Sequence, residues 1–150
     1  MAENLQFGFD RTAALDARIN ELLYRFDAQV KPWPLTAEQR DLLRLLQWHK
    51  SVAQAITIAD ISAKLSIDAR AVKEAVRSLV VDFRLPIMGS RRPPYGYYLA
   101  ITPEEISQGL KTLRGEIVEL ARRIRSVEST NYLREMLGQI AVELEQEEVR

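Results

Sequence analysis

The 150-residue sequence contains no cysteine and only one histidine, His49. Without cysteine the chain cannot form disulfides, iron–sulfur clusters, zinc–thiolate sites or a thiol nucleophile. A single imidazole also excludes metal sites built from several histidines. We therefore expect no bound metal and no cofactor. Because a chain without disulfides suits a reducing compartment, we expect a cytoplasmic protein.

The sequence also lacks long apolar runs and recognisable catalytic motifs. No stretch approaches the ~18 apolar residues of a membrane span, and the first residues do not resemble an export signal. The six glycines form no phosphate-binding loop, and no serine-nucleophile motif or convincing carboxylate pair is present. These absences predict a protein that is neither an enzyme nor bound to a membrane.

Charge is balanced overall, with 21 basic and 21 acidic residues, but it is unevenly distributed. Residues 40–100 hold 10 basic and 5 acidic side chains, whereas residues 1–39 and 101–150 both carry a net negative charge. A basic middle between acidic flanks is typical of a chain in which only the middle contacts a polyanion.

Residues 1–35 are predicted to form an N-terminal helical arm with a proline linker. Apolar residues at spacings of four and three form one stripe of an amphipathic helix from Arg11 to about Val30. The members of the stripe are Leu15, Ile19, Leu22, Phe26 and Val30. Pro32 and Pro34 then end the helix.

Residues 36–101 are predicted to form a helix-turn-helix followed by a hairpin. Thr36 and Gln39 have the spacing of a capping box for a leucine-rich helix, and we expect Trp48 at its end to be a core or linker-docking residue. The segment 56–58 favours a short edge strand. Two helices follow, at 59–65 and from Ala69 to about Val81, with Asp68 as the N-cap of the second.

The residues after Phe83 change to a β pattern. Residues 85–88 and 97–101 are expected to form two strands around a loop with the sequence G-S-R-R-P-P-Y-G. A hairpin directly after a helix-turn-helix is a wing. The predicted fold is therefore mainly α with a small β-hairpin wing, a winged helix-turn-helix flanked by N- and C-terminal amphipathic helices.

Residues 102–150 are predicted to form a helical, coiled-coil-like dimerisation region. Thr102 and Pro103 begin a helix, and apolar residues then repeat at heptad spacing. With Leu110 at position a, the isoleucines at a and leucines at d favour a two-stranded parallel coil. The residues predicted to form the dimer are Leu110, Leu113, Ile117, Leu120, Ile124 and Val127. A second stripe follows Ser129, and whether the chain folds back there is left open.

Two segments resemble a known family. The run I-T-I-A-D-I-S-A-K-L-S-I-D-A-R-A-V-K-E-A-V-R-S-L resembles winged helix-turn-helix domains of bacterial and phage DNA-binding proteins, such as those of biotin-ligase repressors. The wing P-I-M-G-S-R-R-P-P-Y-G-Y-Y-L-A-I-T-P-E-E is similar to small prophage-type winged-helix proteins with a helical tail. One departure is Ser66, where many such turns have glycine.

A winged helix that binds duplex DNA inserts its second helix into the major groove. Here the residues predicted to face the DNA are Arg70, Ala71, Lys73, Glu74 and Arg77. Those predicted at the wing are Ser90, Arg91, Arg92 and Tyr95. The arginine fork can bond guanine O6 and N7 together, and the wing arginines would reach the minor groove or the phosphate backbone.

The sequence thus favours sequence-dependent double-stranded DNA binding by a homodimer, as a transcription regulator or a phage or prophage DNA-binding factor. The alternative is a winged helix that contacts only proteins, for example as a replication or transcription adaptor. The acidic C-terminal helix is a candidate surface for a protein partner in either case. The target DNA sequence, the biological process and the oligomeric state beyond a dimer stay open.

Overall fold

The computed structural model describes residues 2–24 and 35–149, with side chains from Ala13 onward. The chain divides into two compact units, Met1–Gly109 and Leu110–Arg150. We call them the winged-helix unit and the arm. The predicted linker prolines, Pro32 and Pro34, lie outside the described residues, as do Phe26 and Val30 of the predicted N-terminal stripe. No helix among the described residues is long and apolar enough to cross a lipid bilayer.

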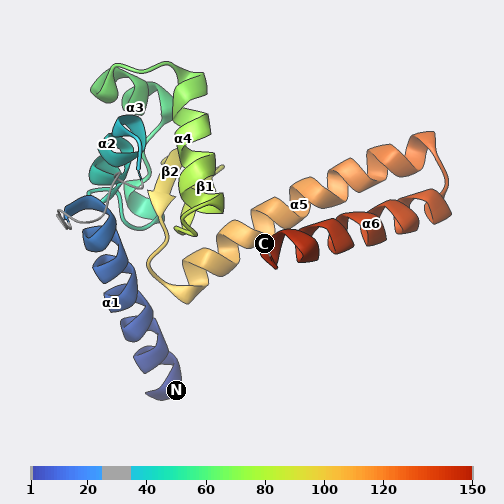
Figure 1. Cartoon of the computed structure of the whole chain (residues 1–150), viewed down its shortest axis with the longest axis horizontal. Coiled ribbons are helices and arrows are strands. Elements are labelled where there is room, and N and C mark those ends of the chain that lie inside the picture. Colours follow the sequence, from blue (N-terminus) through green and yellow to red (C-terminus); the bar gives the residue numbers. More distant parts are fainter. Residues whose placement is uncertain (1, 25–34, 150) are drawn as a thin grey trace. The chain divides into compact units, whose positions relative to one another are not determined.

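The described residues of the winged-helix unit form four complete α-helices, the first turns of a fifth, one 3-10 turn and a two-stranded hairpin (Figure 1). The helices are α1 (Ala2–Tyr24), α2 (Ala37–Leu46), α3 (Ile58–Leu65) and α4 (Ala69–Val81), and η1 (Val52–Gln54) is the 3-10 turn. The hairpin consists of β1 (Ile87–Ser90) and β2 (Gly96–Leu99), after which α5 (Pro103–Val127) begins. This order of elements is a winged helix-turn-helix, and the predicted fold class is confirmed.

Local side-chain caps fix where the helices begin. The Thr36 hydroxyl accepts from the Gln39 amide while the Gln39 side chain accepts from the Thr36 amide, so the predicted capping box is confirmed. A carboxylate oxygen of Asp68 accepts from the Ala71 amide at 2.7 Å, which confirms Asp68 as the N-cap of α4. Between α3 and α4, Ser66 adopts the left-handed conformation, with φ 55° and ψ 40°.

The hairpin is antiparallel, and both edges of β2 are paired. Ile87 lies opposite Leu99 and Ser90 opposite Gly96, so the strands are shifted by a residue or two from the predicted 85–88 and 97–101. On its other edge, β2 exchanges backbone hydrogen bonds with Ile56 through Tyr97. The predicted 56–58 strand is wrong beyond this single bridge, because the Thr57 hydroxyl caps α3, which starts at Ile58.

Gly96 is required where the wing meets this bridge. Its φ is +117°, and a Cβ added there would collide with the Ile56 carbonyl. Only glycine therefore lets the two backbones approach so closely. The base of the wing is joined through this contact to the segment that leads into α3.

The core of the winged-helix unit is formed by buried aliphatic residues from all four helices and the hairpin. In α1, Ile19 and Leu23 are buried, although Leu23 was not part of the predicted stripe. A salt bridge of 3.0 Å between Lys50 and Asp16 also joins α1 to the segment before η1. α1 therefore packs on the winged helix itself.

The prediction that Trp48 lies in the core is wrong, and the alternative that it docks the linker concerns residues outside the described part of the chain. The Trp48 side chain is 80% exposed. α2 ends at Leu46, and Trp48 follows in the turn, where the periodicity of the helix no longer sets its direction. The three residues of α2 that are buried are Leu42, Leu43 and Leu46.

The arm consists of the larger part of α5 and of α6 (Thr130–Glu148). The Ser129 hydroxyl accepts from the Tyr132 amide and caps α6, so the chain turns at 128–129 and folds back along α5 (Figure 1). This answers the question that the sequence left open. None of the residues from Leu110 to Val149 is buried.

Candidate nucleic-acid interface

α4 presents one apolar and one polar face, as its periodicity predicts. Val72, Ala75, Val76 and Leu79 are buried, while Arg70, Lys73, Glu74 and Arg77 are exposed. Ala71 is half-buried beside them. The three cationic residues recur at intervals of three and four, so they lie along one side of the helix. Such a row can face a groove of DNA.

The cations on this face differ in their partners. The Arg70 guanidinium forms a 3.0 Å ion pair with Glu74, one helical turn away, and both side chains are largely exposed. Among the described residues, Lys73 and Arg77 have no ion-pair partner. Exposed pairs of this kind are worth at most about 1 kcal/mol, so Arg70 can exchange Glu74 for another anion.

A hydrogen-bond chain holds the C-terminal half of α4 against α2. The Gln39 side-chain amide donates to the Ser78 hydroxyl at 2.9 Å, and that hydroxyl donates to the Asp82 carboxylate at 2.7 Å. Gln39 is also the capping-box residue of α2. The start of α2 and the end of α4 are thereby fixed to each other, which limits rotation of the exposed face of α4.

The tip of the wing is exposed and basic. Residues 91–95, including Arg91, Arg92 and Tyr95, are all exposed. The Ser90 hydroxyl donates to the Arg92 carbonyl at 2.8 Å and shapes the turn. Ser90 therefore has a structural contact that accounts for it, whereas the Arg92 side chain extends into solvent.

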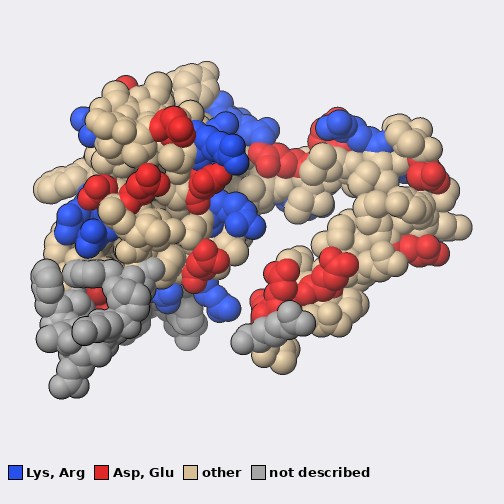
Figure 2. Space-filling model, turned by 45° about the horizontal axis from the view of Figure 1, so that its top comes forward, with Lys and Arg blue, Asp and Glu red and all other residues tan. Residues whose placement is uncertain are grey.

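β1 packs against α4, which places the base of the wing beside the helix with the cationic row. Figure 2 shows lysine and arginine side chains gathered along the side of the winged-helix unit that carries α4. We call the surface formed by Arg70, Lys73, Arg77, Arg91 and Arg92 the basic surface.

Tyr97 and Tyr98 do not belong to the exposed tip. Tyr98 is 2% exposed, and its pKa is raised by burial and by the nearby Glu105 carboxylate. Burial likewise raises the pKa of Tyr97. Both therefore support the wing from inside, and Tyr95 alone of the three tyrosines is exposed.

The apolar stripe predicted to form a dimer faces solvent. Leu110, Leu113, Ile117, Leu120 and Val127 are between 49% and 85% exposed, and Ile124 is half-buried. The return of α6 along α5 has not covered this stripe. α6 exposes a second stripe with Leu137, Ile140 and Leu144.

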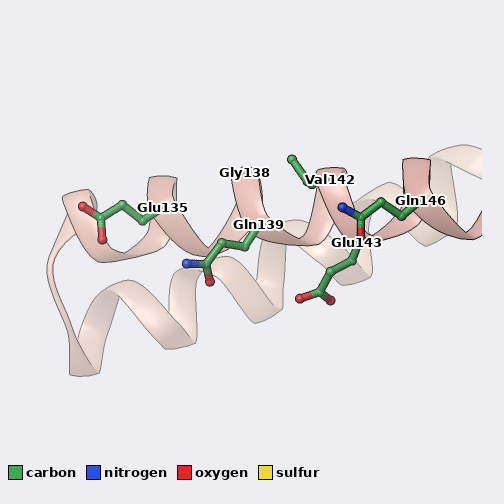
Figure 3. A pocket seen from close by; sticks show the side chains of 6 residues that line it. All are labelled: Glu135, Gly138, Gln139, Val142, Glu143 and Gln146. Carbon is green, nitrogen blue, oxygen red and sulfur yellow. The ribbon is translucent and has the colours of Figure 1, made fainter.

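A hollow of about 570 Å³ lies along α6 (Figure 3). Its lining residues are Glu135, Gly138, Gln139, Val142, Glu143 and Gln146. All are exposed, so the hollow does not hold a buried polar group aimed at a ligand. Among the described residues, no cluster of three or more histidine, aspartate or glutamate side chains could hold a metal ion.

Sequence reasoning missed the glycines that support the wing. Besides Gly96, Gly109 of α5 is buried, and a Cβ there would lie 2.5 Å from the Met88 sulfur on β1. Gly109 gave no signal in the sequence, because it occurs inside a helical pattern with no turn residue beside it. Gly96 could have been noticed as a glycine between a loop and a strand.

The chain matches no protein-family model and no curated protein. Among solved structures it is similar to MepR, a transcription regulator of the Staphylococcus aureus multidrug efflux pump MepA. The identity is 16%, the TM-score is 0.37, and the match covers 94% of this chain and 93% of that chain.

Two further similar structures come from other bacteria. Wild-type Lactococcus lactis ZitR in complex with DNA is 19% identical, with a TM-score of 0.32 over 95% of this chain and 97% of that chain. The adhesin competence repressor AdcR from Streptococcus pyogenes is 22% identical, with a TM-score of 0.36 over 89% and 95% of the two chains.

Proposed function

We propose that this chain binds double-stranded DNA in a sequence-dependent way and acts as a dimeric transcription regulator. The observation that carries the proposal is the basic surface, with α4 and the wing side by side and their cations exposed. α4 enters the major groove, where Arg70, Lys73 and Arg77 meet base edges and phosphates. Ala71 and Glu74 lie at the edge of the same contact.

The wing contributes affinity more than sequence discrimination. Arg91 and Arg92 bind phosphates or the minor groove, where readout is limited to A·T against G·C pairs. Tyr95 packs on the sugar–phosphate backbone, and Ser90 holds the turn that presents them. Each phosphate neutralised by an arginine releases counterions, so binding weakens steeply with added salt.

Two copies joined through their arms would bind two half-sites on one duplex. The dimer contacts proposed here are Leu110, Leu113, Ile117, Leu120, Ile124 and Val127. Linking two DNA-binding units makes the second contact intramolecular and raises the overall affinity without new contacts in either unit.

Fluorescence anisotropy with mixed-sequence duplexes, between about 50 and 200 mM salt, tests the proposal. We expect salt-dependent binding by the unaltered chain. In the double variant Arg91→Ala, Arg92→Ala, affinity for every sequence should fall about tenfold or more, and the salt slope should decrease by up to about 2. The matched control is Arg18→Ala, Arg134→Ala, which removes two exposed arginines outside the basic surface and should change neither quantity.

Two outcomes would contradict this account. No binding, or binding indifferent to salt, would reject DNA as the partner and leave the winged helix as a protein-contact module. Unchanged affinity and slope in the Arg91, Arg92 variant would reject the role of the wing alone.

A further inference from the structure

The contacts within the arm bury none of its described residues. The arm is about 40 residues long, a length at which a chain needs disulfides, a metal or association with another chain. Cysteine is absent, no metal-binding cluster occurs among the described residues, and none of residues 110–149 is buried. Apolar stripes on both α5 and α6 are instead about half exposed. These stripes are therefore available to a second chain.

Clusters of like charge lie toward the two ends of the arm, although Lys111 and Arg114 share the end at which α6 finishes, and Glu119, which pairs with Arg122 at 3.3 Å, lies near the other. Arg122, Arg123 and Arg125 lie in the last turns of α5, next to the turn at 128–129. Four glutamates, at positions 143, 145, 147 and 148, lie in the last turns of α6. Because α6 folds back along α5, these two clusters lie at opposite ends of the arm (Figure 1).

The glutamates lie where the helix itself disfavours them. The C-terminal end of an α-helix carries partial negative charge, so acidic side chains in its last turns are destabilising. The arginines at the end of α5 have the opposite, favourable relation to their own helix. Positive charge from outside the helix, supplied by Lys111 and Arg114 of α5 or by a second chain, therefore stabilises the acidic end of α6.

We propose that a second copy of this chain covers the arm in antiparallel orientation. The arginine end of each copy then lies against the glutamate end of the other, and the two contacts are equivalent by two-fold symmetry. A parallel pair would place arginines on arginines and glutamates on glutamates. The charges therefore favour the antiparallel orientation, whereas the isoleucines and leucines at the heptad positions favour the parallel one. This inference rests on the proposed dimer but not on DNA binding.

Charge reversal tests the orientation in the full-length chain without DNA. One variant carries Arg122→Glu, Arg123→Glu and Arg125→Glu, and the other carries Glu143→Lys, Glu145→Lys and Glu147→Lys. In light scattering at micromolar concentration the unaltered chain should be a dimer. Each variant alone should dissociate about tenfold or more readily, because its three contacts become repulsive. An equal mixture of the two should regain the dimer, since both contacts are then attractive.

A matched control distinguishes the effect of charges at the arm from the effect of a change in the net charge of the whole chain. Arg44→Glu, Lys64→Glu, Arg84→Glu makes the same charge change in the winged-helix unit, and the dimer should persist. A monomeric unaltered chain, reversed variants that still dimerise as tightly, or a mixture that stays monomeric would each overturn the proposal. Loss of the dimer in the control would overturn it as well. Circular dichroism confirms that each variant has kept its helices.

The absence of cysteine allows a second, independent readout. Ser126 lies beside the arginines and Gln146 among the glutamates, and both side chains are exposed. Each is changed to cysteine in a separate variant, Ser126→Cys or Gln146→Cys. Under mild oxidation, a mixture of the two single variants should form a cross-linked dimer, whereas Ser126→Cys alone should not. Efficient cross-linking of Ser126→Cys with itself would show a parallel pair and reject the antiparallel one.

Discussion

The winged-helix unit and the arm are both built from amphipathic helices, yet they use their apolar side chains differently. In the winged-helix unit, α2 buries three leucines completely and α4 buries four residues. In the arm, leucines at equally regular spacing are about half exposed. The periodicity of a sequence therefore shows which side of a helix is apolar, but not whether its own chain covers that side.

The largest expected difference between the two units concerns the cost of removing one leucine. Leu42 of α2 is fully buried, so Leu42→Ala should lower the free energy of unfolding by about 2–5 kcal/mol. Urea denaturation measures this quantity. Leu120→Ala in the arm is the matched control, because Leu120 is 54% exposed.

Leu120→Ala should change self-association and leave the free energy of unfolding of the winged-helix unit almost unaffected. At low protein concentration, where the chain is monomeric, Leu120→Ala should leave the unfolding of the winged-helix unit almost unchanged. It should instead weaken self-association in light scattering. Equal destabilisation by both substitutions at low concentration would show that the chain itself buries the arm, and would contradict the difference between the two units.

A smaller difference between the two units is expected in how their tyrosines affect thermal stability at alkaline pH. The folded state raises the pKa of Tyr98 above its usual 10.0 through burial and the Glu105 carboxylate. Below pH 10 the phenol is neutral in both folded and unfolded chains, and the stabilisation is fully present. As the pH rises past 10, the unfolded chain releases the proton more readily, so stability falls until the folded phenol also ionises.

Replacing the titrating group should remove this dependence. Tyr98→Phe should flatten the loss of thermal stability above pH 10. The control is Tyr132→Phe, because the Tyr132 side chain on α6 is 45% exposed, and this variant should lose stability as the unaltered chain does. Melting temperatures measured across pH 8 to about 11 would show the difference. An identical alkaline decline in Tyr98→Phe and the unaltered chain would contradict the assignment.

The smallest effect is expected at the turn between α3 and α4. Ser66 has a φ of 55°, a region that costs a residue with a side chain about 1–2 kcal/mol. Ser66→Gly should therefore stabilise the winged-helix unit by about 0.5 kcal/mol, after the greater entropy of glycine in the unfolded chain is subtracted. Ser107→Gly, inside α5, should have the opposite sign. A destabilised Ser66→Gly variant would contradict this account.

The parts of the fold that could be predicted are those set by neighbouring residues. Thr36 and Asp68 cap their helices through bonds to amides three residues away, so sequence alone was sufficient. The Thr102 hydroxyl accepts from the Glu105 amide for the same reason, as predicted for the start of α5. The exposed cations of α4 followed from a single helical period.

The parts that could not be predicted depend on segments far apart in the chain. The pairing of Ile56 with Tyr97 spans some forty residues, and nothing near either residue encodes it. The exposure of Trp48 depends on where α2 ends, and the return of α6 depends on a turn at 128–129 whose residues fit several conformations. For the candidate interface, the sequence predicted which side chains are cationic, whereas the packing of β1 against α4 required the structure.

The contact between Gly96 and Ile56 divides the wing into a base that is fixed by backbone hydrogen bonds and a tip that is exposed to solvent. Below it, the strand register is locked by backbone bonds on both sides of β2, and substitutions there alter the scaffold. Beyond it, the five residues of the tip face solvent. Their number and charge can therefore be changed by substitution or insertion while the scaffold below them stays the same.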